Sequence, residues 1–278
     1  MAILKKKYSL PKNFSKGDSL CRRTLRAKRL NQFWIFLTGC TLLFSFQKWS
    51  AKPALPYASA DAGQVIVVVT EGWNSITAKL YGFQKQKDLW QLKFSFPAVV
   101  GQNGLAWGTN EWPEYRNEGP LKKEGDLRSP AGLFLLGPAF GYAGAPEAKW
   151  IHLPYIQASD TLICVDDPNS GLYNKLIRKG SAKSDWGSHE EMHRKDDDYQ
   201  WGIFVQYNSH PVKPGQGSCI FLHIWEGADQ GTAGCTAIEK KNMLTLLHWI
   251  RTDQQPLLIQ FPVEVYKKIR KKYALPEL

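Results

Sequence analysis

The hydrophobic pattern of the chain predicts mainly β-strands. Residues 64–70 (Gln-Val-Ile-Val-Val-Val-Thr) are apolar and β-branched on both faces, which is typical of a strand buried on both sides. Segments 77–83 and 89–96 alternate between apolar and polar residues, and the turn-forming residues 86–88 separate them. We therefore expect an antiparallel meander that ends at Pro97.

Later apolar runs predict more strands and one helix. The further strands are expected at 133–136, 162–165, 200–207, 219–222 and 256–265. Apolar residues at spacings of three and four predict a helix from about Glu239, with Met243, Leu244, Leu246, Leu247 and Ile250 on its apolar face. The basic tail 267–272 is interpreted as solvated surface. This order of elements predicts a β-rich α+β domain with one principal helix after Cys235.

The first fifty residues differ in composition from the rest. They contain eleven Lys and Arg against one acid, Asp18, and the apolar run 33–46 follows the basic segment. This pattern is typical of an export signal, because a membrane span needs roughly 20 apolar residues. Lipidation at Cys40, cleavage after Ala58-Ser59-Ala60 and retention as an anchor all remain open. Each delivers the rest of the chain across a membrane, to the periplasm or cell envelope.

Three regions follow from this composition. Residues 1–50 are the basic segment with its export signal or anchor, 51–63 a linker, and 64–278 one catalytic domain whose core spans about 98–262. The net charge is +11, but beyond residue 50 there are 36 − 11 = 25 basic and 25 − 1 = 24 acidic residues, a balance of +1. A nearly neutral folded part argues against nucleic-acid binding, and membrane contact is expected only through the N-terminal segment.

The five cysteines separate by position. Cys21 and Cys40 lie in the leader, which leaves an odd number, three, for an oxidising compartment. Cys164 and Cys219 either pair with each other or are two small buried residues in strands. Cys235 is the natural candidate for a free thiol.

A histidine and this cysteine stand at the ends of two predicted elements. The run 219–222 brings His223 to a strand end, and a short loop leads to Thr232-Ala233-Gly234-Cys235 just before the helix. A thiol nucleophile needs a neighbouring base, and a helix N-terminus or an imidazole lowers its pKa. Gly234 permits a tight turn that directs backbone N–H groups at an oxyanion. The other reading is a core histidine and a small buried cysteine.

A second motif suggests different chemistry. His189-Glu190-Glu191-Met192-His193 matches the zinc-peptidase pattern H-E-x-x-H, which requires two histidines one helical turn apart. Its flanks are polar, whereas such a helix normally packs on the core. We therefore interpret it as a short exposed helix or turn with a positioning role, and a zinc peptidase remains the alternative.

The motif around Cys235 resembles the L,D-transpeptidase catalytic domain (YkuD-type). That family carries a His on a strand and then Ser/Thr-x-Gly-Cys, here His223 and residues 232–235. Residues 125–132 (Gly-Asp-Leu-Arg-Ser-Pro-Ala-Gly) are similar to its second signature. One branch of the family also has the motifs found here at Asp166-Asp167-Pro168, Tyr173-Asn174, Glu191-Met192, Tyr207-Asn208 and Gly217 to His223.

The resemblance implies a YkuD-like β-sandwich of mixed sheets and a cysteine acyltransferase of the cell wall, with a role in cell-wall biogenesis and cell shape. Cys235 would attack a peptidoglycan stem peptide, release terminal D-alanine and form a thioester that an amine acceptor resolves, either a second stem or a wall-linked protein. His223 would be the general base and acid, and backbone around Gly234 would hold the oxyanion. Expected substrate-binding residues are Thr232, Ser218, Tyr207, Asn208 and Arg128. No cofactor or metal is implied.

The sequence also departs from the better-known family pattern. Ala233 and Ala237 stand where many relatives have His and Arg, so a substrate carboxylate must be recognised by another group; Arg128 and Arg178 are candidates. If water replaces the amine, the same thioester gives an L,D-carboxypeptidase or endopeptidase. A wall-binding protein without activity is the alternative from another class.

Overall fold

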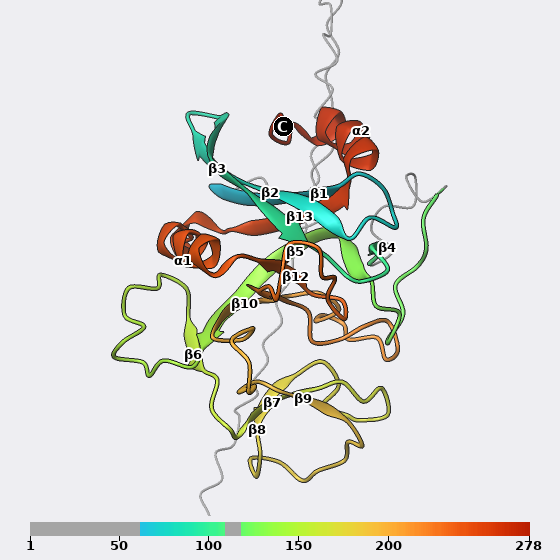
Figure 1. The fold of residues 1–278 in the computed structure, drawn as a ribbon, viewed down its shortest axis with the longest axis vertical. Helices are drawn as coiled ribbons and strands as arrows, with labels where there is room; N and C mark the ends of the chain where they lie inside the picture. The colour runs from blue at the N-terminus through green and yellow to red at the C-terminus, as the bar shows by residue number, and fades with distance from the viewer. Residues whose placement is uncertain (1–61, 109–117) are drawn as a thin grey trace, which may run out of the picture. The chain divides into compact units, whose positions relative to one another are not determined.

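The computed structural model describes residues 62–108 and 118–278 (Figure 1). The predictions for the export signal, for Cys40 and for nearly all of the linker therefore fall outside the described residues. Within the described ranges, no helix combines the length and the apolar character needed to cross a membrane.

The main sheet closes into an eight-stranded barrel. Its strands follow one another around the barrel in the order β10, β11, β12, β3, β2, β1, β13 and β5, and β5 pairs again with β10. Their bounds are β10 Trp201–Val205, β11 Phe221–Ile224, β12 Thr236–Ile238, β3 Leu89–Val99, β2 Thr77–Gln86, β1 Gln64–Thr70, β13 Leu257–Pro262 and β5 Ser129–Gly141. Two short strands, β4 Leu105–Trp107 and β6 Tyr155–Gln157, extend the sheet from β5.

The long strand β5 makes the closure possible. Of its 13 residues, 132–135 pair with β13 and 136–141 pair with β10. One strand thus supplies a partner for two strands that would otherwise lie at open edges. The pairing of β5 with both β13 and β10 closes the sheet, so that neither β10 nor β13 is an open edge strand.

The predicted meander is confirmed, because β1, β2 and β3 pair antiparallel in sequence order. β1 has the predicted bounds and all of its side chains are buried. The meander does not end at Pro97, however, since β3 continues through Pro97 to Val99 and pairs there with β2 and β12.

The predicted sandwich with one principal helix is wrong. The sheet is a closed barrel, and the described residues contain two short α-helices of similar length, α1 Lys240–Trp249 and α2 Val263–Tyr273. α1 follows Cys235 as predicted, but α2 occupies the end of a predicted strand and the basic tail that we interpreted as solvated surface. Tyr266 and Ile269 on α2 are buried, while its lysines lie on the other faces, so the segment is an amphipathic helix.

A smaller three-stranded sheet adjoins the barrel (Figure 1). It contains β7 Leu162–Val165 between β8 Leu176–Arg178 and β9 His189–Glu191. A disulfide joins Cys164 on β7 to Cys219, just before β11. Cys164 and Cys219 therefore pair, which the sequence left open. Both belong to a second apolar cluster that also contains Phe140, Phe221 and Cys235, separate from the main barrel core.

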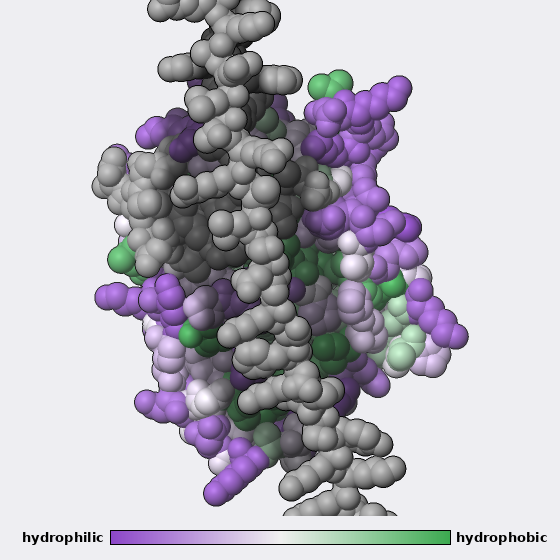
Figure 2. All heavy atoms as spheres, turned by 180° about the vertical axis from the view of Figure 1, so that it is seen from behind, coloured by the Kyte–Doolittle hydropathy of each residue, from purple (hydrophilic) through white to green (hydrophobic). Residues whose placement is uncertain are grey.

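On the part of the surface that Figure 2 leaves uncovered, hydrophilic side chains predominate and hydrophobic side chains lie among them. The few large hydrophobic residues that are exposed in the described part include Leu89 and Leu92 on β3. Isolated exposed leucines are normal in globular proteins and imply no partner.

The disulfide should contribute substantially to stability. It closes a loop with a sequence separation of 55, for which the chain-entropy model gives about 4 kcal/mol. We expect Cys164→Ala/Cys219→Ala to lower the free energy of unfolding by about 2–4 kcal/mol in urea titrations. The comparison is made in a Cys21→Ala/Cys40→Ala/Cys235→Ala background, so that no other cysteine can exchange with the disulfide. Equal stability of the two proteins would contradict this expectation.

Candidate functional site

His223 and Cys235 lie on neighbouring parallel strands. β11 and β12 pair in the register Leu222 with Thr236 and His223 with Ala237, so Cys235 immediately precedes β12 next to Phe221. Side chains alternate along β11, and Leu222 and Ile224 enter the main core while Phe221 faces the second cluster. His223 therefore points to the same side as Phe221, which is also the side of Cys235.

The turn that presents Cys235 is built from local hydrogen bonds. Thr232 Oγ1 accepts the N–H of Gly234 (3.1 Å) and donates to the carbonyl of Cys235 (2.5 Å). Gly234 has φ of +148°, and a Cβ there would lie 3.2 Å from the carbonyl oxygen of Arg128. The left-handed φ and the close approach both favour glycine at this position.

The segment 125–132 supports Cys235 through Ser129. Ser129, the first residue of β5, donates from Oγ to the carbonyl of Cys235 (2.7 Å) and accepts the N–H of Gly101 (2.8 Å). The Cys235 carbonyl thus accepts two hydroxyl donors, from Ser129 and Thr232. This contact explains physically why the two sequence motifs occur together in one chain.

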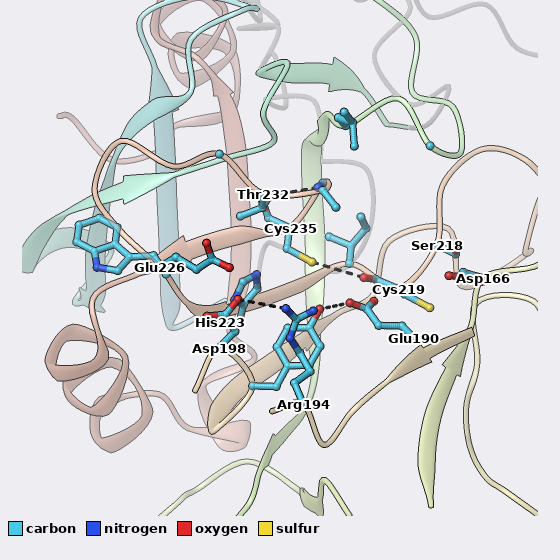
Figure 3. A pocket seen from close by; sticks show the side chains of 18 of the residues that line it. Asp166, Glu190, Arg194, Asp198, Ser218, Cys219, His223, Glu226, Thr232 and Cys235 are labelled. Carbon is cyan, nitrogen blue, oxygen red and sulfur yellow. Dashed lines mark hydrogen bonds and ion pairs between the residues drawn. The ribbon is translucent and has the colours of Figure 1, made fainter. Parts of the chain in front are cut away.

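Both residues line one cavity of about 450 Å³ (Figure 3). Its wall is formed by residues of β9 and the segment that follows it, by residues 218–220 before β11, and by the loop from Trp225 to Cys235. The wall also carries one arginine, Arg194, and several carboxyl groups: Glu124, Asp166, Glu190, Asp198 and Glu226. A substrate that enters this cavity can therefore reach the thiol of Cys235.

His223 is held as a neutral base. Its Nδ1 lies 2.7 Å from the carbonyl oxygen of Ile224, and because a carbonyl only accepts, Nδ1 carries the proton. Nε2 is then unprotonated and able to take a proton. Burial lowers the pKa of His223 to about 4, so the neutral form prevails at pH 7. The edge of the Tyr199 ring packs on the imidazole at 5.1 Å between centroids.

Cys235 is a neutral thiol in the free protein. Burial, and next the charge of Glu190, raise its pKa well above the ordinary value. Sγ accepts the N–H of Phe221 (3.2 Å) and donates to the carbonyl of Cys219 (3.5 Å). No hydrogen bond joins Sγ to His223 within residues 62–108 and 118–278, so the thiol must turn from Cys219 before it transfers its proton to the imidazole.

The helix that follows Cys235 does not activate it. α1 begins at Lys240, whereas a helix terminus acts within about one turn, so its dipole is too distant to lower the thiol pKa. The prediction that the N-terminus of this helix lowers the pKa of Cys235 is therefore wrong.

The raised pKa predicts slow alkylation of Cys235 at neutral pH. With Cys21 and Cys40 replaced by Ala, the rate of modification by iodoacetamide should rise about tenfold per pH unit between pH 7 and 9 without levelling, because the thiolate fraction still increases there. The urea-unfolded protein is the control and should level above the ordinary cysteine pKa of about 8.5. A plateau already at pH 7 in the folded protein would show a preformed thiolate and contradict the expectation.

The predicted substrate-binding residues divide into two groups. Thr232 and Ser218 line the cavity, although Ser218 Oγ donates to Glu124 (2.7 Å). Tyr207, Asn208 and Arg128 are not among its lining residues. The Arg128 guanidinium instead bonds to the carbonyls of Trp73 and Leu105 and to Asn74, so it braces the barrel.

The two Tyr-Asn pairs are scaffold. Asn174 donates from Nδ2 to the carbonyls of Tyr207 and Asn208 and accepts the N–H of Cys219 (2.9 Å). Asn208 donates in turn to the carbonyl of Gly217 (2.9 Å), and the Tyr207 hydroxyl donates to that of Gln216. These bonds set the path of the chain into β11. Arg178, also considered for substrate binding, bonds to Ser159 and does not line the cavity.

The oxyanion role of Gly234 is only partly supported by its contacts. Its N–H donates to Thr232 Oγ1 at 3.1 Å, so in the free protein that donor is already in use. Stabilisation of an oxyanion by Gly234 requires this long hydrogen bond to be shared or exchanged.

The H-E-x-x-H stretch does not form the zinc site or the helix that its sequence permits. His189, Glu190 and Glu191 are strand β9, so the two histidines are not stacked on one helical turn. His193 contacts Asp160 and the ring of Tyr142, whereas His189 bonds to Glu191. The described residues contain no group of three potential ligands positioned for a metal.

Three residues that line the cavity together with His223 were not predicted from the sequence: Glu190, Arg194 and Asp198. Glu190 accepts the Tyr199 hydroxyl, and burial raises the pKa of Glu190 to about 7. Arg194 bonds through Nε and Nη2 to Asp196 and lies over the Tyr199 ring. Asp198 lines the same wall, and burial raises its pKa to about 6. The polar composition of 184–198 indicated an exposed surface. The segment also lacks the alternation of apolar and polar residues that would have distinguished the cavity residues from the others.

Comparisons with known proteins give little beyond this geometry. The chain matches no family model and no curated protein. A solved structure, that of Bd1075 from Bdellovibrio bacteriovorus, is similar with 15% sequence identity and a TM-score of 0.38. The match covers 78% of the present chain and 57% of the Bdellovibrio protein, so the chain spans little more than half of its length.

Proposed function

We propose that the protein is a cysteine acyltransferase of peptidoglycan, an L,D-transpeptidase acting in the cell envelope. The observation that carries the proposal is the pairing of a free thiol with an imidazole in one cavity. Cys235 is the free cysteine of the described chain, and the Nδ1 bond of His223 leaves Nε2 unprotonated. A nucleophile and a base with this hydrogen-bonding state fit acyl transfer through a thioester. The sequence resemblance supplies the substrate class.

The proposed reaction has two steps. His223 takes the Cys235 proton as sulfur attacks the carbonyl of the diamino acid in a stem peptide. The bond to terminal D-alanine breaks, D-alanine leaves with that proton on its nitrogen, and the acyl group remains on sulfur as a thioester. An amine then attacks the thioester and gives its proton to His223, the new amide bond forms, and the cysteine sulfur is reprotonated.

Cys235 and His223 are both uncharged in the free protein, which suits these two reaction steps. A buried thiol and imidazole that are both uncharged avoid the cost of a buried ion pair in the free protein, and charge develops only when substrate is bound. Because the pKa of His223 is lowered to about 4, the imidazole is almost entirely unprotonated at neutral pH and is therefore a competent proton acceptor there. Hydrolysis follows the same path with water as acceptor.

The test is an analysis of products by mass spectrometry. The protein is incubated with a purified disaccharide tetrapeptide, and the soluble products and the intact protein are weighed. Cross-linked dimers formed with loss of D-alanine support transfer, and stems shortened by D-alanine identify hydrolysis of the same bond. Unchanged substrate, together with unmodified protein, would overturn the proposed function.

A further inference from the structure

Positive charge is unevenly distributed over residues 51–278. The turn end of the β2–β3 hairpin (residues 84–93) and the C-terminal residues 263–278 together contain eight Lys and Arg against three acids, an excess of five. We call these two segments the basic end. The rest of residues 51–278 has 25 − 8 = 17 basic and 24 − 3 = 21 acidic residues, a balance of −4. The nearly neutral total therefore hides a separation of charge within the folded domain.

The two segments of the basic end contact each other. The indole Nε1 of Trp90 on β3 donates to the carbonyl of Ala274, which follows α2, at 3.3 Å. Figure 1 shows the hairpin, the C-terminus and α2 at the same end of the domain, with the sheet of β7, β8 and β9 at the other end. Lysines from segments far apart in the sequence thus contribute to one surface.

The lysines of this surface extend into solvent. Lys87 and Lys93 on the hairpin and Lys268 and Lys271 on α2 are all exposed, while the buried side of α2 packs on β1 and β13. An amphipathic helix with exposed lysines beside a second basic segment is the arrangement expected of a surface that attracts anions from solution.

Two exposed apolar side chains lie among these charges. Leu89 is 72% and Leu92 is 55% exposed, and the regular pairing of this part of β3 with β2 places them on opposite faces of the hairpin. Neither leucine by itself implies a partner. Next to exposed lysines, however, they can enter the boundary between lipid headgroups and acyl chains while the ammonium groups contact phosphates.

The basic end is remote from the cavity. β12, which follows Cys235, pairs with β3 at Ala98 and Val99, whereas the hairpin turn precedes Leu89 at the other end of β3. The ten residues between them correspond to about 33 Å of strand. A domain bound through its basic end would therefore keep the cavity well away from the surface that it binds.

The chain enters the domain at the same end. The carbonyl of Gly63, just before β1, accepts the backbone N–H of Lys85 on β2 (2.8 Å). Fifteen residues, 47–61, separate the apolar run 33–46 from Ala62, and fully extended they reach about 50 Å. Retention of that run as an anchor, one of the three outcomes that the sequence leaves open, would hold the basic end near the bilayer.

We infer that the basic end is a docking surface for a membrane that contains anionic phospholipids. Its lysines contact the lipid phosphates, Leu89 and Leu92 enter the interface, and the acidic remainder of the domain is repelled from the same membrane. Each Lys or Arg near such a membrane raises the affinity roughly fivefold. Docking of this kind is independent of the proposed function, and it adds a second membrane contact to the one expected through the N-terminal segment.

Fluorescence quenching locates the basic end relative to vesicles. A fluorophore is attached to one introduced cysteine, Gln86→Cys at the basic end or Ser181→Cys in the exposed loop after β8, in the Cys21→Ala/Cys40→Ala/Cys235→Ala protein, which keeps the disulfide. Each full-length protein is mixed with vesicles of phosphatidylcholine and phosphatidylglycerol that carry a nitroxide-labelled lipid. We expect clear quenching at residue 86 and little at residue 181.

Charge variants assign this quenching to the basic end. The N-terminal segment is itself basic and is present in every sample, so only differences between positions and between variants report on the folded domain. The basic-end variant replaces four exposed lysines with glutamine: Lys87, Lys93, Lys268 and Lys271. The matched control removes four exposed lysines elsewhere, none of which lines the cavity: Lys149, Lys175, Lys183 and Lys195.

The two variants should behave differently. Loss of four contributions of roughly fivefold each should reduce quenching at residue 86 to the level at residue 181, whereas the control variant should keep the wild-type difference. Equal quenching at the two positions in the wild type, or quenching at residue 86 that survives in the basic-end variant, overturns the inference. Thermal unfolding checks that each variant is folded, and Lys268→Gln/Lys271→Gln alone, with a partial loss expected, replaces the fourfold variant if that protein is unfolded.

Activity keeps this inference separate from the proposed function. With Cys235 intact, the basic-end variant should convert the soluble disaccharide tetrapeptide at the wild-type rate, because none of its four substituted lysines lines the cavity. A loss of quenching with unchanged conversion supports docking by the basic end. A fall in conversion that parallels the loss of quenching would show that the substitutions disturb the whole domain and would overturn the assignment.

Discussion

Replacement of Cys235 by Ala should abolish product formation, with a loss of kcat/KM of at least about a thousandfold. The thioester requires the sulfur, and nothing else that lines the cavity offers a comparable nucleophile: the hydroxyl of Ser218 is bonded to Glu124, and that of Thr232 to Cys235. Mass spectrometry of the intact protein should show an acyl adduct on the wild type shortly after mixing with substrate and none on the variant.

The matched control for this variant is the Cys21→Ala/Cys40→Ala protein, which retains Cys235. It should keep both the adduct and the turnover, which locates the acyl group on Cys235. A melting temperature close to that of the wild type would show that the small cavity left by Cys235→Ala has not unfolded the site. Turnover by Cys235→Ala comparable to that of the wild type would rule out the thioester.

Replacement of His223 by Gln should lower kcat by about a hundredfold to ten-thousandfold and leave KM within a few-fold. A glutamine amide can donate to the carbonyl of Ile224 in place of Nδ1, but it has no basic nitrogen to accept the thiol proton. His152→Gln serves as the control, because His152 is exposed and does not line the cavity.

The pH dependence of kcat/KM distinguishes a role of His223 as a base from a purely structural role. The pKa of His223 is lowered to about 4, so its basic form is lost only as pH falls through that value. Wild-type kcat/KM should therefore retain the His223 contribution down to about pH 5 and lose it below, and this limb should be absent from the residual rate of His223→Gln. A wild-type limb centred at the ordinary histidine pKa of about 6.5 would contradict a buried, neutral imidazole.

The positions of His223 and Cys235 at the ends of neighbouring elements were predictable because they depend on local sequence. The apolar run that ends in His223 and the Thr-x-Gly-Cys turn each need only neighbouring residues to form, as the bonds of Thr232 and the φ of Gly234 show. β1 and β7 were predicted with their observed bounds for the same reason, since an unbroken apolar run bounded by turn residues indicates a buried strand.

The partners of those elements were not predictable. β12 has only three residues, and it forms because β11 and β3 lie on either side of it, not because its sequence favours a strand. The same holds for β9, whose polar residues pair with β7. Short strands are determined by neighbours distant in the sequence, and no periodicity is detectable over three residues.

The sequence by itself thus determined which thiol and imidazole are the candidate nucleophile and base, and the turn that presents Cys235, because each depends on a few consecutive residues. Only the tertiary structure decided that the sheet closes into a barrel, since closure depends on β5 pairing with both β13 and β10. It also decided that Cys164 and Cys219 pair, leaving Cys235 free, and that Arg194, Glu190 and Asp198 share a wall with His223. These contacts join residues far apart in the chain, where side-chain position and burial, rather than local pattern, set the chemistry.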